Sequence, residues 1–169
     1  MSRAFVREVD EVQPPPMLER PVSTAPNLVT PQGARLIEQT VVALERQIAA
    51  ASDDVPALRR DLRYWSVRRA TMQIVPPVQA PAAVEFGVRV TIRRMERAHK
   101  IYIVGEDEAD PAAGRIAWTA PLSRALRGAK AGETVELKAA GRVEAITVIA
   151  IAAGELVNDA EPSRGLSYR

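Results

Sequence analysis

Apolar residues in the first half of the chain recur at helical spacing in two neighbouring stretches. In "LVTPQGARLIEQTVVALERQIAAASDD" they fall in steps of four and three, at Ile37, Val41, Leu44, Ile48 and Ala51. In "ALRRDLRYWSVRRATMQIV" the same spacing gives Leu58, Leu62, Trp65 and Met72, with Arg69 at a seam position. Such steps line up on one face of a helix. Two narrow seams joined by a short turn predict an antiparallel, coiled-coil helical hairpin.

Local signals mark the ends of both predicted helices. Thr30 is suited to accept a hydrogen bond from a free amide as N-cap, and Pro31 suits the first helical position. The stretch "SDDVP" at 52–56 favours a turn before Pro56 starts the second helix. "PPVQAP" at 76–81 then ends that helix. At ~1.5 Å per residue, arms of about 20 residues reach about 30 Å.

From Val84 onward the pattern changes to alternation, which predicts strands. In "VEFGVRVTIRR" the apolar residues Val88, Val90 and Ile92 share one face. Further strands are expected in "KIYIVG", "GRIAWT", "GETVELKA" and "VEAITVIAI". Pro121 begins a short helix, "PLSRALRG", which Gly128 ends. An antiparallel sheet with one short helix predicts a small α+β domain.

The pattern divides the chain into five parts. Six prolines between residues 10 and 31 remove backbone donors, so no regular element is expected there. The predicted parts are an extended Pro-rich arm (1–29), the hairpin with its tip near 52–56 (30–76), a linker (77–83), the α+β domain (84–152) and a loose tail (153–169).

Composition narrows the possible functions. Apolar residues make up 47% and charged residues 26% of the 169 residues, which is ordinary for a soluble globular protein. The absence of cysteine excludes disulfides and thiolate metal sites, and the single histidine, His99, excludes a zinc site with several imidazoles. With no apolar run of about 20 residues and no signal peptide at the start, we expect a cytoplasmic protein with no membrane contact.

The charge does not favour direct nucleic-acid binding. The pI is near 9.3, but the formal net charge is only +2 and the basic residues are spread along the chain. A nucleic-acid binder is expected to concentrate basic residues on one face. The arginines of the second helix, Arg59, Arg60 and Arg63, either face nucleic acid or form its solvated face. Trp65 and Tyr64 are expected to pack in the seam or against the small domain.

The stretch "IVGEDEADPAAG" at 103–114 concentrates acids. Glu106, Asp107, Glu108 and Asp110 lack the alternate spacing and the glycine of a calcium loop. A Ser/His/Asp site would need His99, which lies in a polar turn where we expect it to be exposed. Two interpretations stay open: the acids form a docking surface, or Asp110 caps its Asp-Pro turn and the others are solvated.

The residues around this stretch resemble a known family. "IVGEDEADPAAGRI", "APLSRALRGAKAGETVEL" and "VEAITVIAI" are similar to the C-terminal domain of the bacterial Gre transcript-cleavage factors, from about Phe86 to Ile151. Ala120 stands where the family usually has serine, and Ser123 where it has alanine. "NLVTPQG" and "LRYWSVRRATMQIVPP" resemble the ends of the Gre N-terminal hairpin. The resemblance implies an FKBP-like fold for the small domain.

The resemblance also implies a partner and a binding surface. Gre factors are transcription elongation factors that bind bacterial RNA polymerase, where the small domain grips the rim helices of the largest subunit near the secondary channel. The residues implied in docking are Gly105, Glu106, Asp107, Glu108, Asp110, Pro121 and Leu122. We expect the fold to survive charge reversal at Asp107 and Glu108, because loop carboxylates are usually outside the core.

The hairpin tip determines the expected chemistry. The Gre tip carries a motif like D-L-S-E-N-A-E-Y, whose carboxylates help hold a magnesium ion for RNA cleavage. Here only Asp53 and Asp54 are acidic, and the arms are shorter. These two are either a reduced catalytic tip that shares Mg²⁺ or turn and cap residues. We expect a docking regulator that is not an enzyme, holds no cofactor tightly, and uses magnesium only if the tip is active.

Two further function classes stay open. An FKBP-like fold permits peptidyl-prolyl isomerisation, which needs an aromatic-lined apolar pocket, and the domain offers Phe86, Tyr102 and Trp118. The third class is a protein-interaction module unrelated to polymerase.

Overall fold

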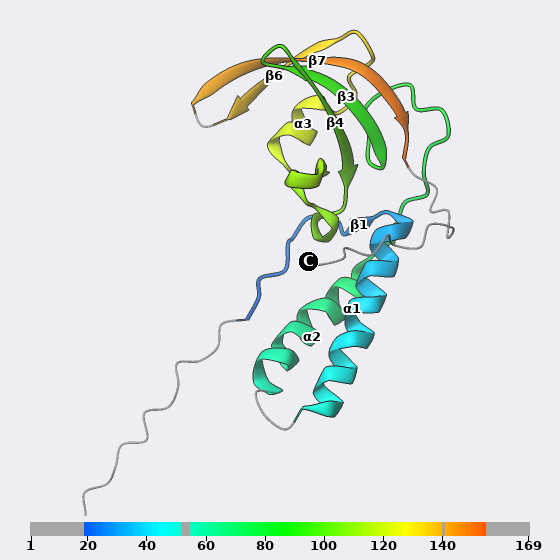
Figure 1. Cartoon of the computed structure of the whole chain (residues 1–169), viewed down its shortest axis with the longest axis vertical. Coiled ribbons are helices and arrows are strands. Elements are labelled where there is room, and N and C mark those ends of the chain that lie inside the picture. The colour runs from blue at the N-terminus through cyan, green and yellow to red at the C-terminus, as the bar shows by residue number, and fades with distance from the viewer. Residues whose placement is uncertain (1–18, 52–54, 140, 155–169) are drawn as a thin grey trace, which may run out of the picture.

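The computed structural model describes residues 19–51, 55–139 and 141–154. Helix α1 spans Pro31–Ala50 and helix α2 spans Val55–Thr71. The two helices form a hairpin that projects from a small sheet domain (Figure 1). The tip candidates Asp53 and Asp54 lie outside the described residues.

The start of α1 follows the sequence prediction. Thr30 has extended backbone, its Oγ1 accepts a hydrogen bond from the Gly33 amide at 3.0 Å, and a proline occupies the first turn. Ile37 and Val41 are fully buried, whereas Leu44 and Ile48 farther along the seam are only partly buried. The hairpin is therefore packed most tightly at its base.

A pair of short strands closes the base of the hairpin. Strand β1 (Leu28–Val29) pairs in parallel with β2 (Gln73–Ile74), just before α1 and just after α2. Val29, Ala34 and Ile37 form a small buried cluster here, against which Trp65 and Met72 pack. The sequence pattern predicts neither strand, because two residues are too few to establish an alternating pattern.

The small domain contains a five-stranded sheet and one α-helix, which confirms the predicted α+β class. Its strands are β3 (Val88–Arg94), β4 (Arg97–Val104), β5 (Arg115–Ala117), β6 (Thr134–Ala139) and β7 (Arg142–Ala153). Their order in the sheet is β5-β4-β3-β7-β6, and helix α3 spans Pro121–Leu126. The expected antiparallel pairing is wrong for β5, which runs parallel to β4.

The domain core lies on the face of the sheet that α3 covers (Figure 1). Val88, Val90 and Ile92 of β3 are buried there, as their alternation predicts. Leu126 of α3 and Ile146 of β7 complete the centre of this core. The residues between them in β3 point to the opposite face of the sheet, as the two-residue period of a strand requires.

The turn between β3 and β4 consists of Met95 and Glu96, both with positive φ (45° and 61°). His99 therefore lies within β4 and not in a turn, although it is exposed as predicted. Two single 3₁₀ turns follow β4: η1 (Glu106–Glu108) and η2 (Pro111–Ala113). Within the described ranges, no helix has the length and apolar character needed to span a membrane.

Candidate functional site

The acidic stretch lies at the junction of the hairpin and the small domain. Strand β4 ends at Val104, and η1 then places the Glu106–Glu108 turn against β1 and the start of α1. Three carboxylates thus come from the small domain to the point where both helices are anchored. Each of them has partners on the hairpin side.

Glu108 joins the small domain to the start of α1. Its Oε1 accepts hydrogen bonds from the Thr30 amide at 2.9 Å and from the Gly105 amide at 3.1 Å. Its Oε2 accepts from the Thr30 hydroxyl, whose oxygen in turn accepts from the Gly33 amide. Glu108 is buried, and a carboxylate beside a helix N-terminus is stabilised by the helix dipole.

Two glycines make room for this carboxylate. A Cβ on Gly33 would lie 2.1 Å from Glu108 Cδ, and a Cβ on Gly105 would lie 2.6 Å from the Leu28 carbonyl oxygen. Both separations are far inside van der Waals contact, so any larger residue must displace Glu108 or β1. Glycine is therefore required at positions 33 and 105, because the hairpin base and the small domain approach each other closely there.

Asp107 joins the small domain to the end of α2. Its Oδ1 accepts a hydrogen bond from the Tyr64 hydroxyl at 2.6 Å, and its Oδ2 accepts from Arg68 Nε. The side chains of Arg68 and Asp107 are only 2% and 3% exposed. An ion pair so deeply buried is stable only while both partners are present, because a lone buried charge is costly.

The same contact changes the titration of Tyr64. Burial, together with the hydrogen bond to Asp107, raises the pKa of Tyr64 from 10.0 to about 12. The phenol therefore keeps its proton well beyond neutral pH and remains a donor to the Asp107 carboxylate.

Glu106 completes the junction on its outer side. Its Oε1 accepts from the Ser23 hydroxyl and from the Thr119 hydroxyl, both at 3.0 Å. Its Oε2 faces Arg68 Nη2 at 3.6 Å, within ion-pair range but beyond a hydrogen bond. Arg68 is thus held between two carboxylates.

We call this arrangement the clamp: Glu106, Asp107 and Glu108 of the small domain with Thr30, Tyr64 and Arg68 of the hairpin base. Its contacts correct one expectation from the sequence. Asp107 and Glu108 were expected to lie outside the core, yet both side chains are almost fully enclosed. Loop position did not predict exposure here, because the hairpin base packs over this loop.

The segment before β1 lies along α2 and reinforces the clamp. Asn27 Nδ2 donates to the Arg68 carbonyl at 2.7 Å and to the Thr71 hydroxyl at 3.2 Å, near the end of α2. The Arg20 guanidinium stacks over the Tyr64 ring, 3.7 Å from its centroid. The end of α2 is therefore held from two sides.

The second half of the acidic stretch is a separate exposed turn. Asp110 Oδ1 accepts from the Ala113 amide at 3.3 Å, and its Oδ2 accepts from Arg115 Nη2 at 3.0 Å. Both charged side chains are 43% exposed. The interpretation that Asp110 caps its Asp-Pro turn is confirmed. Pro121, at the first position of α3, is exposed, and Leu122 is half-buried against the core.

Sequence reasoning missed Arg68, the central cation of the clamp. The helical seam placed Arg69 inward, whereas Arg69 is exposed and its neighbour Arg68 is buried. Burial of an arginine depends on carboxylates distant in sequence, which helical periodicity does not encode. The expected packing of Tyr64 and Trp65 is confirmed: Tyr64 bonds to the small domain and Trp65 packs on the hairpin cluster.

The remaining candidates are spread over the surface. Arg60 pairs with its neighbour Asp61, and Arg63 pairs with Glu19. Phe86 and Trp118 line one cavity of about 240 Å³, whereas Tyr102 lines a different groove. Across the described residues, no three histidine or acidic side chains gather as a metal site.

This architecture defines a two-part α+β protein in which a helical hairpin is clamped to a small sheet domain. The model of the transcription elongation factor GreA/GreB C-terminal domain matches residues 78–153. The small domain of this chain is therefore similar to the C-terminal domain of GreA/GreB factors, which confirms the resemblance inferred from its motifs.

Individual relatives agree with this assignment. Transcription elongation factor GreA of Neisseria meningitidis serogroup B is 41% identical over 76 residues, 44% of this chain and 48% of the relative. GreA of Bradyrhizobium diazoefficiens is 45% identical over 67 residues, 38% of this chain and 43% of the relative. The chain thus spans about half the length of the curated relatives it matches.

The solved structures that match this chain are more distant in sequence. The crystal structure of GreA factor homolog 1 of Thermus thermophilus is 15% identical, with a TM-score of 0.37 over 75% of this chain and 99% of that one. A prokaryotic GreA/GreB factor from Nitrosomonas europaea is 20% identical, with a TM-score of 0.38 over 76% and 98%.

Proposed function

We propose that this protein is a cytoplasmic regulator of transcription elongation that binds bacterial RNA polymerase through its small domain. The observation that carries the proposal is the identity to GreA proteins, up to 45%, combined with a family match over residues 78–153. The proposed contact is the rim of the polymerase secondary channel, as the Gre resemblance implies. The chain itself is not an enzyme under this proposal.

The proposed docking surface comprises Gly105, Glu106, Asp107, Glu108, Asp110, Pro121 and Leu122. Within this set the exposed side chains are suited to touch the partner: Asp110 as a carboxylate for a basic group and Pro121 as an apolar contact. Asp107 and Glu108 act indirectly, because their carboxylates already bind the hairpin base. They hold the hairpin at a fixed angle to the docking surface.

The hairpin is proposed to occupy the channel entrance without supporting cleavage. Helix α1 has 20 residues and α2 has 17, so the arms are about 30 and 26 Å long at ~1.5 Å per residue. The alternative is a true cleavage factor that delivers Mg²⁺ through Asp53 and Asp54. Under both proposals, any RNA cleavage would be catalysed by the polymerase and not by this chain.

Binding to purified bacterial RNA polymerase tests the docking proposal. Pro121→Gly and Asp110→Arg should each weaken binding about tenfold or more by removing an apolar or a charged contact. Lys138→Ala is the control, since it is an exposed residue on β6, at the opposite edge of the sheet from β5. Unchanged affinity in both docking variants would reject this surface, and no binding by the wild type would reject the function.

A cleavage assay on a backtracked polymerase complex tests the proposal that the hairpin does not support RNA cleavage. The wild type should promote little or no RNA cleavage, and changing Asp53 and Asp54 together to alanine should leave binding intact. Strong cleavage that disappears in this double variant would replace our proposal with the Mg²⁺-delivering alternative.

One observation favours a second candidate, a prolyl isomerase. Phe86 and Trp118 line a cavity together with Val84 and Ile103, so part of the expected aromatic pocket is present. Tyr102, the third aromatic expected there, lines another groove. A proline-peptide isomerisation assay with a Trp118→Ala control would detect this activity. A rate equal to the uncatalysed rate would exclude it.

A further inference from the structure

The face of the sheet opposite α3 is basic along β3, β4 and β5. Alternate residues of β3 and β4 point to this face, and the pairing register places Arg89 beside Tyr102 and Thr91 beside Lys100. Arg93 continues the row on β3, and Arg115 on β5 pairs with Tyr102. The β7 residues opposite β3 here are Ala150 and Ala152, which are small. Cationic side chains therefore surround a floor of alanine and threonine.

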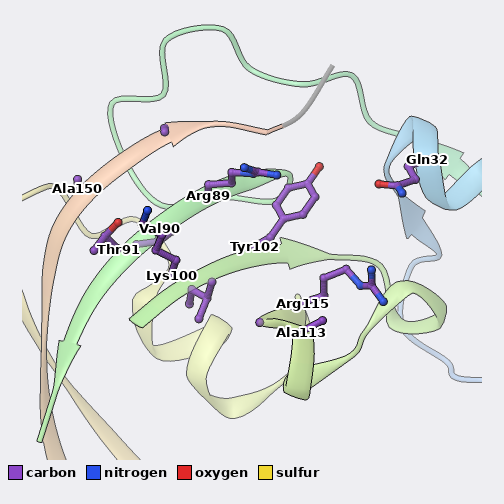
Figure 2. A pocket seen from close by; sticks show the side chains of 12 residues that line it. Gln32, Arg89, Val90, Thr91, Lys100, Tyr102, Ala113, Arg115 and Ala150 are labelled. Carbon is purple, nitrogen blue, oxygen red and sulfur yellow. The ribbon is translucent and has the colours of Figure 1, made fainter. Parts of the chain in front are cut away.

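A groove of about 550 Å³ runs over this floor. Figure 2 shows Arg89 and Tyr102 rising from neighbouring strands, with Arg115 nearby and Gln32 of α1 across the groove. The Arg89 guanidinium lies 5.6 Å from the centroid of the Tyr102 ring. The groove is thus bordered by the small domain on one side and by the hairpin base on the other.

The groove has cationic groups to offer a ligand. Lys100 lines the groove, is exposed and has no ion-pair partner among the described residues. Arg115 uses Nε for the Glu108 carbonyl and Nη2 for Asp110, which fixes its position at the groove edge. Among the described residues, no acidic side chain lines this groove. Its field therefore favours an anionic occupant.

We propose that this groove binds an acidic segment of a partner protein, with carboxylates on Arg89, Lys100 and Arg115. The small floor residues Ala150 and Ala152 let a polypeptide backbone approach the sheet closely. Single-stranded nucleic acid fits less well, because it is held by several stacked aromatic rings. Among its described lining residues the groove has one such ring, with an arginine at its face. The groove lies on the other side of the sheet from Pro121 of the proposed docking surface, and the two sites meet at the Arg115–Asp110 pair.

The test measures binding of a fluorescein-labelled peptide of alternating glutamate and alanine to the full chain by fluorescence anisotropy. The matched peptide has glutamine in place of glutamate. We expect the glutamate peptide to bind and the glutamine peptide to bind at least about tenfold more weakly, with affinity falling as salt rises. Equal binding of the two peptides would overturn the proposal.

Two charge reversals locate the site. Lys100→Glu should lower the affinity about tenfold or more, and Arg59→Glu on the exposed face of α2 should change it less than about twofold. Equal losses would mean that only net charge matters and would overturn the site. Circular dichroism checks the fold, and Lys100→Gln, which should give a smaller loss in the same direction, replaces Lys100→Glu if that variant misfolds.

Two competitors decide the class of occupant. A single-stranded oligonucleotide that displaces the glutamate peptide at lower concentration than the unlabelled peptide itself would identify nucleic acid as the better ligand and overturn the proposal. A peptide with this chain's own acidic sequence "GELVNDAE" (154–161) that binds more tightly than the glutamate peptide would identify the chain itself as the occupant, with the same result. Weaker binding by both competitors supports a partner protein.

Discussion

The two halves of the acidic stretch have the same residue types and opposite environments. Glu106, Asp107 and Glu108 turn toward the hairpin, where two of their side chains are almost fully enclosed. Asp110, two residues farther, caps an exposed turn and pairs with a half-exposed arginine. The first half fastens two parts of the molecule together, and the second half is available to a partner.

The difference teaches that a cluster of carboxylates is not one functional unit. A buried carboxylate with several donors contributes to stability, because its removal leaves those donors unpaired. An exposed ion pair contributes little and is free to exchange partners. Variants in the first half should therefore change stability strongly, and those in the second half should change binding.

The largest effect is expected from Arg68→Met. It leaves Asp107 as a buried charge without its cation, which should lower the free energy of unfolding by about 3–5 kcal/mol. The control is Arg69→Met, an exposed arginine one position along α2, which should cost less than about 0.5 kcal/mol. Urea denaturation measures both, and equal effects would show that burial of Arg68 is unimportant.

The next largest loss of stability is expected from Glu108→Gln. The amide keeps the shape of the side chain but removes the charge and places a donor next to the Thr30 hydroxyl, so we expect a loss of about 1–3 kcal/mol. Thermal unfolding gives the measurement. A melting temperature unchanged from the wild type would mean that Glu108 does not hold α1.

The titration of Tyr64 predicts a pH dependence. Its folded pKa is about 12 against 10.0 in the unfolded chain, so its stabilisation is fully present below pH 10.0 and is lost as pH rises to about 12. Because Tyr64 is partly exposed, we expect the loss to be about 1 kcal/mol after solvent screening. The stability difference between wild type and Tyr64→Phe should shrink over this range, and a constant difference would contradict the assignment.

The smallest stability effect is expected from Asp110→Asn. Asparagine still caps the turn, and the exposed pair with Arg115 contributes little, so the cost should be below about 0.5 kcal/mol. Chemical denaturation of Asp110→Asn and Glu108→Gln under the same conditions compares their losses of unfolding free energy. A loss as large as that of Glu108→Gln would erase the distinction between the two halves.

The sequence predicted the elements well where a local pattern sets them. The N-cap at Thr30, the buried face of β3 and the start of α3 at Pro121 each follow from a few neighbouring residues. The sequence did not predict the strands β1 and β2 or the parallel pairing of β5. Strands of two or three residues are too short to show a period. Periodicity alone predicted only a small α+β domain. The family motifs related that domain to the C-terminal domain of the Gre factors.

The candidate site was predicted only in part. The motif located the acidic loop, and of the two interpretations left open, the turn cap at Asp110 is seen in the structure. The burial of Asp107 and Glu108 was not foreseen, since it depends on Arg68 and Thr30, which are 39 and 78 residues away in the chain. Gly33 was the one residue that could have indicated this contact. Glycine has low helix propensity, so its presence in the first turn of a helix suggests that another group, here Glu108, approaches the backbone closely.

The most direct test of the clamp is a double-mutant cycle at Arg68 and Asp107. The unfolding free energy is measured for wild type, Arg68→Met, Asp107→Asn and the double variant. If the two side chains form the buried pair described, their coupling energy should be about 2 kcal/mol or more, since removing either leaves the other unpaired. Additivity within about 0.5 kcal/mol would contradict the clamp, because it would mean that Arg68 and Asp107 do not stabilise each other.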